Sequence, residues 1–99
     1  MAEPEYHPEA SDEVANAFSH YASVNSEVGE RFKLELNRAE QLVQRSPDSC
    51  RTFFHGTQGF RFRGFPFVTA YIVRDERIIA IAAARTRRTP GYWRSRLTD

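Results

Sequence analysis

The spacing of apolar residues changes once along the chain, and this change constrains the fold more than any other feature of the sequence. From residue 8 to residue 46, apolar side chains recur every three or four positions, as they do on one face of a helix. From residue 59 onward, they recur every second position, as they do along a β-strand. The sequence therefore predicts a layer of helices packed on a sheet, an α+β sandwich of two layers.

The helical part is expected to form two helices joined by a short turn, an antiparallel hairpin. Pro8 suits a first helical turn, and Asn25 in the segment "SVNSE" is expected to cap the second helix, which ends at Pro47. Gly29 indicates a close approach of the two helices near their turn. The expected apolar stripes are Ala10, Val14, Ala17, Phe18 and Tyr21, then Val28, Phe32, Leu36, Ala39 and Val43.

The second part predicts an antiparallel meander of three strands followed by a short terminal helix. The strands are expected at "FRFR" (60–63), "FVTAYIV" (67–73) and "IIAIAAA" (78–84), with a tight turn at Asp75-Glu76 and a loop at 55–59. Thr89 and Pro90 suit the start of a helix in "PGYWRSRL". A fourth strand at Glu5 to His7 is an open alternative.

Length and composition favour a single cytoplasmic domain spanning residues 1–99. A chain of 99 residues buries one core, and its one cysteine, Cys50, forms no internal disulfide. The start "MAEPEYHPEA" does not resemble a signal peptide, and no apolar run approaches a membrane span. The three histidines, His7, His20 and His55, lack ligand spacing, so neither a metal nor another cofactor is expected.

Charge is divided unequally between the two halves of the chain. Residues 1–50 carry four basic and ten acidic side chains, whereas residues 51–99 carry ten arginines and three acidic side chains. Five of these arginines, with a Tyr-Trp pair, lie in "ARTRRTPGYWRSRL" (84–97). This pattern indicates a face made for a polyanion or an acidic partner; the alternative is that it serves only solubility.

The basic half supplies the candidate binding residues. Arginine binds phosphate or carboxylate through two hydrogen bonds and stacks on aromatic rings. If the last strand continues far enough, alternation places Arg85 and Arg87 on one face and Arg88 on the other. Trp93 has an alternative role, as a packing residue that anchors the last helix on the sheet. The candidate set is Arg61, Arg63, Arg85, Arg87, Arg88, Tyr92 and Trp93.

Three segments resemble the RelE/ParE superfamily, the toxins of bacterial type II toxin–antitoxin modules. They are "VNSEVGERFKLEL" (24–36), "VRDERIIAIAA" (73–83) and "ARTRRTPGYWRSR" (84–96), of which the last is the most specific. With the order of elements, the resemblance covers residues 8 to 96. It implies a toxin kept silent by a cognate antitoxin that wraps it and covers the basic surface, with operator DNA contacted only through the antitoxin.

The resemblance leaves the target open, because RelE-like members cut mRNA on the ribosome and ParE-like members inhibit DNA gyrase by binding. Cleavage of RNA without a metal needs a base and an acid as well as cations for the phosphate. The basic half has no lysine, and Arg85 stands where many relatives have a histidine. Tyr92 matches a functional tyrosine of the nucleases but would need a lowered pKa.

These residues favour a gyrase-binding toxin and leave two alternatives. One is a ribosome-dependent mRNA endoribonuclease that uses Arg61, Arg85, Arg88 and Tyr92. The other is an inactive or plain nucleic-acid-binding module. Whether the protein is an enzyme therefore stays open at the level of the sequence.

Overall fold

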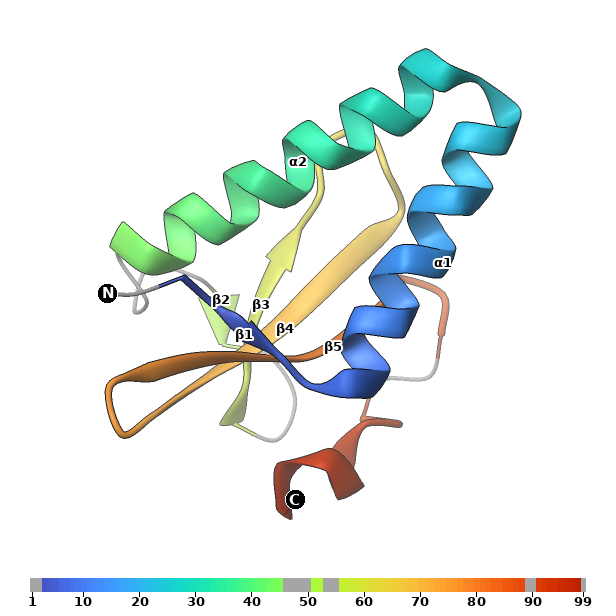
Figure 1. Cartoon of the computed structure of the whole chain (residues 1–99). Helices are drawn as coiled ribbons and strands as arrows, with labels where there is room; N and C mark the ends of the chain where they lie inside the picture. Colours follow the sequence, from blue (N-terminus) through green and yellow to red (C-terminus); the bar gives the residue numbers. More distant parts are fainter. Residues whose placement is uncertain (1–2, 46–50, 53–55, 89–90, 99) are drawn as a thin grey trace.

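Two helices lie across one face of a mixed β-sheet, and the C-terminal segment covers part of the opposite face (Figure 1). The structure is a computed structural model that describes residues 3–45, 51–52, 56–88 and 91–98. The predicted α+β class and the helix hairpin are confirmed. Pro47, Cys50, His55, Thr89 and Pro90 lie outside the described residues.

The two helices are α1 (Pro8–Val24) and α2 (Ser26–Arg45), and Asn25 alone separates them. Asn25 has extended backbone angles, and its N–H donates to the Tyr21 carbonyl at 3.2 Å to close α1. Its Oδ1 accepts from the Glu27 N–H at 2.8 Å. Asn25 therefore ends one helix and caps the next, which confirms the predicted cap.

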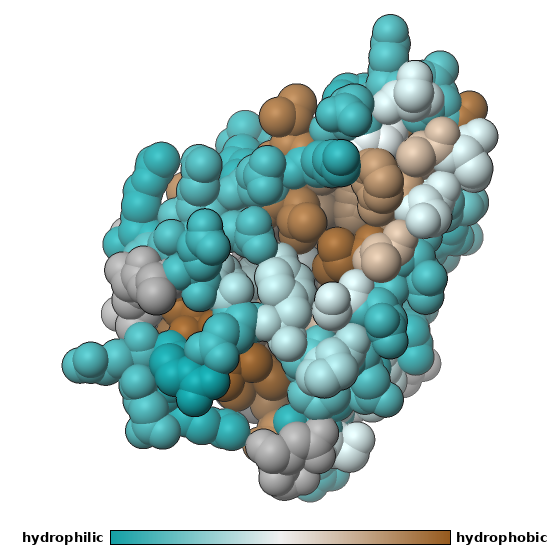
Figure 2. Space-filling view, in the orientation of Figure 1, coloured by the Kyte–Doolittle hydropathy of each residue, from teal (hydrophilic) through white to brown (hydrophobic). Residues whose placement is uncertain are grey.

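The hairpin requires a glycine at position 29. A Cβ built on Gly29 would lie 2.9 Å from the Cβ of Ala22 and 3.0 Å from its Cα. The helices touch here and then diverge from the turn as a V (Figure 1). Figure 2 shows an apolar area between them. Val14 and Ala17 of α1 and Leu36 of α2 pack against the core and are only partly buried.

Within the described residues, the sheet has five strands in the order β1-β5-β4-β3-β2. The meander β3-β4-β5 is antiparallel, as predicted, and the Asp75-Glu76 turn joins its last two strands with φ values of 54° and 62°. Both residues therefore occupy the left-handed region that a two-residue hairpin turn requires. The strand bounds are Glu5–Tyr6 (β1), Arg51–Thr52 (β2), Gln58–Arg61 (β3), Phe67–Arg74 (β4) and Arg77–Arg85 (β5).

Four details differ from the prediction. A fifth strand, β2, was not expected and pairs antiparallel with β3, so the sheet has five strands where three or four were predicted. The open alternative of a first strand is realised, but β1 joins β5 in parallel, so the sheet is mixed. β3 begins at Gln58, inside the segment expected to be a loop, because Gln58 and Gly59 pair with Tyr71 and Ala70 of the long strand β4. The C-terminal segment forms a 3₁₀ helix only at Arg94–Thr98, since Gly91 with φ 86° interrupts the expected helix.

Each face of the sheet carries its own apolar cluster. On the helix side, Phe32 of α2 packs against Phe62 and Phe67, with ring centroids 5.2 Å and 5.1 Å apart. On the opposite side, Trp93 packs among residues of β4 and β5, and it is 2% exposed. The C-terminal segment is therefore part of the core and not an appended tail.

We expect Gly29→Ala to destabilise the protein although alanine favours helices. Forcing a methyl group into a close contact costs about 1–3 kcal/mol, and the gain in helix propensity is about 1 kcal/mol. The free energy of unfolding in urea should fall by up to about 2 kcal/mol. Glu30→Ala, at an exposed position beside it, is the matched control and should change little. A more stable Gly29→Ala variant would contradict the close contact.

Candidate functional site

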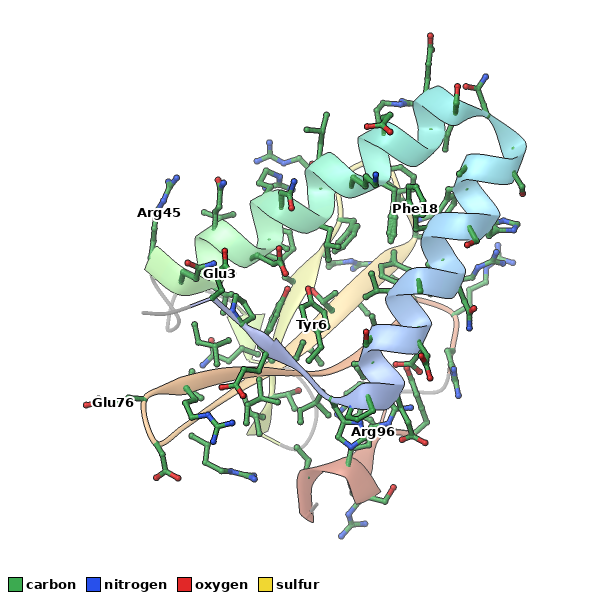
Figure 3. All side chains as sticks on the ribbon, in the orientation of Figure 1. Glu3, Tyr6, Phe18, Arg45, Glu76 and Arg96 are labelled. Carbon is green, nitrogen blue, oxygen red and sulfur yellow. The ribbon has the colours of Figure 1, made fainter. Side chains whose placement is uncertain are left out.

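The carboxylate of Glu13, on α1, is the centre of the C-terminal region. It accepts the hydroxyl of Tyr92 at 2.6 Å and the backbone N–H of Ala83 at 3.1 Å. Arg96 reaches it with two nitrogens, at 2.8 Å and 3.2 Å, and Arg88 with one at 3.4 Å. Figure 3 shows Arg96 extending from the C-terminal turn toward the start of α1. One side chain thus joins α1, β5 and the C-terminal segment.

Glu13 and Arg96 occupy this position because β1 is too short to cover the edge of β5. β1 pairs with Ile79 and Ala80, and the His7 N–H donates to the Ala80 carbonyl at 2.9 Å before the chain turns into α1. Beyond this point, Glu13 accepts the Ala83 N–H and Arg96 donates to the Ile81 carbonyl at 3.0 Å. Two side chains therefore bond backbone groups that a longer edge strand would have paired.

Glu13, Arg88, Tyr92 and Arg96 form a cluster that keeps the Glu13 carboxyl ionised and the Tyr92 hydroxyl protonated. Burial raises the pKa of the Glu13 carboxyl, but hydrogen bonds from Arg96, Tyr92 and Ala83 outweigh burial and bring this pKa below its ordinary value. Burial raises the pKa of the Tyr92 hydroxyl, and the hydrogen bond to Glu13 raises it further. The lowered tyrosine pKa that proton transfer would need is therefore not present in this arrangement.

An open groove lies beside this cluster, between α1 and the end of β5. Its volume is about 590 Å³. We call it the α1–β5 groove; α1 and the strands contribute Glu13, Asn16, Ala17, His20, Tyr21, Phe67, Ala83 and Ala84, and the end of β5 and the turn after it contribute Arg85, Arg87 and Arg88. Its floor is mostly apolar and its rim is cationic.

Three of the predicted arginines meet at this groove, and the condition for the predicted split between them is not met, because the strand does not continue to Arg88. Arg88 does not point to the face opposite Arg85, because β5 ends at Arg85 and a turn follows. The Arg88 N–H donates to the Arg85 carbonyl at 3.0 Å, and this turn brings Arg85, Arg87 and Arg88 to one groove. The Arg88 guanidinium also stacks 3.6 Å from the centre of the Tyr92 ring.

Arg61 and Arg63 do not join this group. Arg61 pairs with Val68, which pairs with Ala84, whereas Arg85 pairs with Phe67. Paired residues share a face and neighbours alternate, so Arg61 and Arg85 point to opposite faces of the sheet. Arg63 follows β3, and its backbone N–H donates to Glu35 of α2 at 2.6 Å. The four residues of the nuclease alternative are therefore not brought together.

Trp93 is not a surface residue, and its assignment to the binding set is corrected. Its ring packs in the cluster of Ala70, Ile72, Ile81 and Ala82 at 2% exposure. An indole buried to this extent stabilises the fold and cannot contact a partner directly. The packing alternative considered for Trp93 is the one that the structure confirms.

Sequence reasoning missed Glu13, Arg96 and His20 as members of this region. The signal for Glu13 was its position, because it follows Ala10 by three residues and precedes Ala17 by four, which places a carboxylate beside the apolar stripe of α1. His20 is exposed at the groove, with its ring 5.2 Å from that of Tyr21. Glu76 lies at the tip of the hairpin, away from Arg96 (Figure 3).

The part of the chain that the structure describes contains no group of three histidine, cysteine or acidic side chains that could hold a metal ion. None of its helices is long and apolar enough to cross a membrane.

No model of a known protein family matches the sequence, and no curated protein matches it either.

We expect Glu13→Gln to lower the free energy of unfolding by about 1.5–3 kcal/mol at pH 7, the range for a hydrogen bond to a charged group. The amide keeps the size of the side chain but loses the charge that faces Arg96. Asp12→Asn, at the exposed neighbouring position, is the control and should change stability little.

The difference between wild type and Glu13→Gln should depend on pH. The pKa of Glu13 in the folded chain lies below its ordinary value of 4.5, so its contribution is complete above pH 4.5 and disappears as the pH falls through the folded value. Urea titrations at a series of pH values should therefore show the two proteins converging in acid. A constant difference down to pH 3 would contradict a charged role for Glu13.

Proposed function

We propose that this protein is a growth-inhibiting toxin of a type II toxin–antitoxin module, that it acts in the cytoplasm by binding DNA gyrase, and that a cognate antitoxin neutralises it. The observation that carries the proposal is the position of Arg85 and Arg87 on the rim of the α1–β5 groove. Both are exposed, and neither forms an ion pair with another described residue. Their charge is therefore available to a partner.

The chemistry of the cluster supports a toxin that binds over one that cuts. Arginine stays protonated and cannot act as an acid or a base near neutral pH. The Tyr92 hydroxyl donates a hydrogen bond to Glu13, and the pKa of this hydroxyl is raised instead of lowered. Arg61 points to the other face of the sheet. The groove thus offers binding charge, while the tyrosine beside it is unsuited to proton transfer.

The ribosome-dependent endoribonuclease remains a second candidate because His20 lines the same groove. Imidazole is the side chain that most often transfers protons in catalysis. The two candidates separate in one experiment, in which a purified sample is tested for inhibition of gyrase supercoiling and for cleavage of translated mRNA. Inhibition of supercoiling without cleavage supports the proposal. Cleavage of mRNA that is lost in the His20→Ala variant would instead support the endoribonuclease. Inactivity in both assays would leave an inactive or plain nucleic-acid-binding module.

Exposed apolar residues support a protein partner for the helix hairpin. Val24 and Leu34 are 67% and 65% exposed, and the V between the helices leaves further apolar side chains partly accessible (Figure 2). An amphipathic segment of an antitoxin would bury such surface and stabilise the chain by binding to it.

We expect the double variant Arg85→Ala/Arg87→Ala to lose growth inhibition while it keeps its stability. Exposed arginines contribute about 0–1 kcal/mol to folding, so thermal unfolding should change little. Colony formation after induction measures inhibition. Arg94→Ala removes an exposed arginine outside the groove and should remain inhibitory. A double variant that melts normally and still inhibits growth would place the working surface elsewhere.

We expect Tyr92→Phe to keep most of the growth inhibition. The change removes the hydrogen bond to Glu13, so the free energy of unfolding should fall by about 1.5–3 kcal/mol. A binding toxin has no other need for the hydroxyl, whereas loss of proton transfer would reduce activity by about 10²–10⁴-fold. Growth and unfolding should be measured on the same variant. Loss of inhibition in a variant that is still folded at the assay temperature would favour the nuclease.

A further inference from the structure

We propose that the α1–β5 groove binds a nucleoside phosphate, with the phosphate held by Arg85, Arg87 and Arg88 and the base on the apolar floor. This ligand goes beyond the proposed function, because inhibition of a protein target requires no small molecule.

The charge of the groove matches a phosphate better than a carboxylate. Three arginines line it, and its one acidic residue among those described, Glu13, accepts two hydrogen bonds from Arg96, which lies outside the groove and also pairs with Glu9 at 2.9 Å. Of the three arginines, only Arg88 forms an ion pair with Glu13, with nitrogen and oxygen 3.4 Å apart. The Arg88 side chain remains 54% exposed. Three arginines and one glutamate leave the groove with a net charge of about +2, whereas a phosphate monoester carries about −1.5 to −2 near pH 7 and a carboxylate carries −1.

The floor of the groove suits an aromatic ring. Ala17 and Tyr21 of α1 line this floor together with the buried residues Phe67, Ala83 and Ala84, so the floor carries no long charged side chain. Asn16 and His20 stand beside this floor and carry hydrogen-bond donors and acceptors that could meet the edge of a base. Apolar lining with a few polar groups is the usual composition of a small-molecule site.

The size and position of the groove fit one nucleotide. A volume of about 590 Å³ lies within the range of roughly 300–1,000 Å³ that ligand sites occupy. Arg88 forms one side, and its guanidinium is fixed by the Tyr92 ring at 3.6 Å and by Glu13. One arginine of the rim is therefore held in place before any ligand arrives, which reduces the entropy lost on binding.

The test is a titration of the full-length purified chain with adenosine 5′-monophosphate and guanosine 5′-monophosphate, followed by NMR shifts and calorimetry. Adenosine without phosphate and inorganic phosphate are the fragments to compare. We expect each fragment to bind about tenfold or more weakly than the nucleotide, since each lacks one set of contacts. On addition of the nucleotide, we expect the NMR resonances of Asn16, His20 and Arg85 to shift.

Variants test the phosphate contacts and the base contacts of the site separately. Arg85→Ala/Arg87→Ala should weaken nucleotide binding about tenfold or more, and Arg94→Ala should not. Asn16→Ala and His20→Ala, at exposed helix positions, should weaken the nucleotide and leave inorganic phosphate unchanged. Thermal melts of every variant establish that it is folded, and growth inhibition is scored separately, so failure of the nucleotide site does not decide the toxin function.

Three outcomes would overturn the inference. The first is binding of inorganic phosphate as tight as that of the nucleotide, which would leave an anion site only. The second is tighter binding of an acidic peptide than of either nucleotide. The third is binding of an unphosphorylated oligonucleotide that Arg85→Ala/Arg87→Ala does not weaken. Competition by a 5′-phosphorylated oligonucleotide would support the inference and identify the end of a strand as a source of the nucleoside phosphate.

Discussion

The C-terminal half of this fold depends on one carboxylate at the uncovered edge of β5. Glu13 accepts the Ala83 N–H, the Tyr92 hydroxyl and the Arg96 guanidinium, and so holds α1, the sheet and the last turn together. A central strand whose edge is left open would expose unpaired backbone groups to other chains. Here the long side chains of two residues complete the edge, and the charge of Glu13 is balanced by Arg96 in the same contact.

This contact divides the arginines of the last segment into two groups. Arg96 and, in part, Arg88 serve the structure, because Arg96 pairs with Glu9 and Glu13, and Arg88 with Glu13. Arg85 and Arg87 line the groove with no ion pair inside the described residues, so they keep their charge for a ligand. A run of basic residues is therefore a weak guide to a binding surface until the acidic residues beside it are known.

Tyr92 and Trp93, in the C-terminal segment beside the groove, show that neighbouring residues can have separate roles. Tyr92 and Trp93 are adjacent in sequence and their rings meet edge to face at 5.1 Å. Trp93 is buried against β4 and β5, whereas Tyr92 is half-buried between Arg88 and Glu13. Substituting Trp93 would remove core packing, and substituting Tyr92 would loosen the contact that holds the groove wall.

The sequence by itself determined the helix hairpin, the antiparallel meander, the Asn25 cap and the tight turn at Asp75-Glu76, because periodicity, capping and turn chemistry act between near neighbours. It also located the basic end, with Arg85, Arg87 and Arg88 among its candidates. Only the tertiary structure decided that β1 pairs in parallel, that Arg61 faces away from Arg85, and that Glu13 and His20 lie beside the arginines. These facts depend on strand register and on contacts between residues about 70 positions apart, such as Glu13 and Ala83, and local pattern carries no information about either.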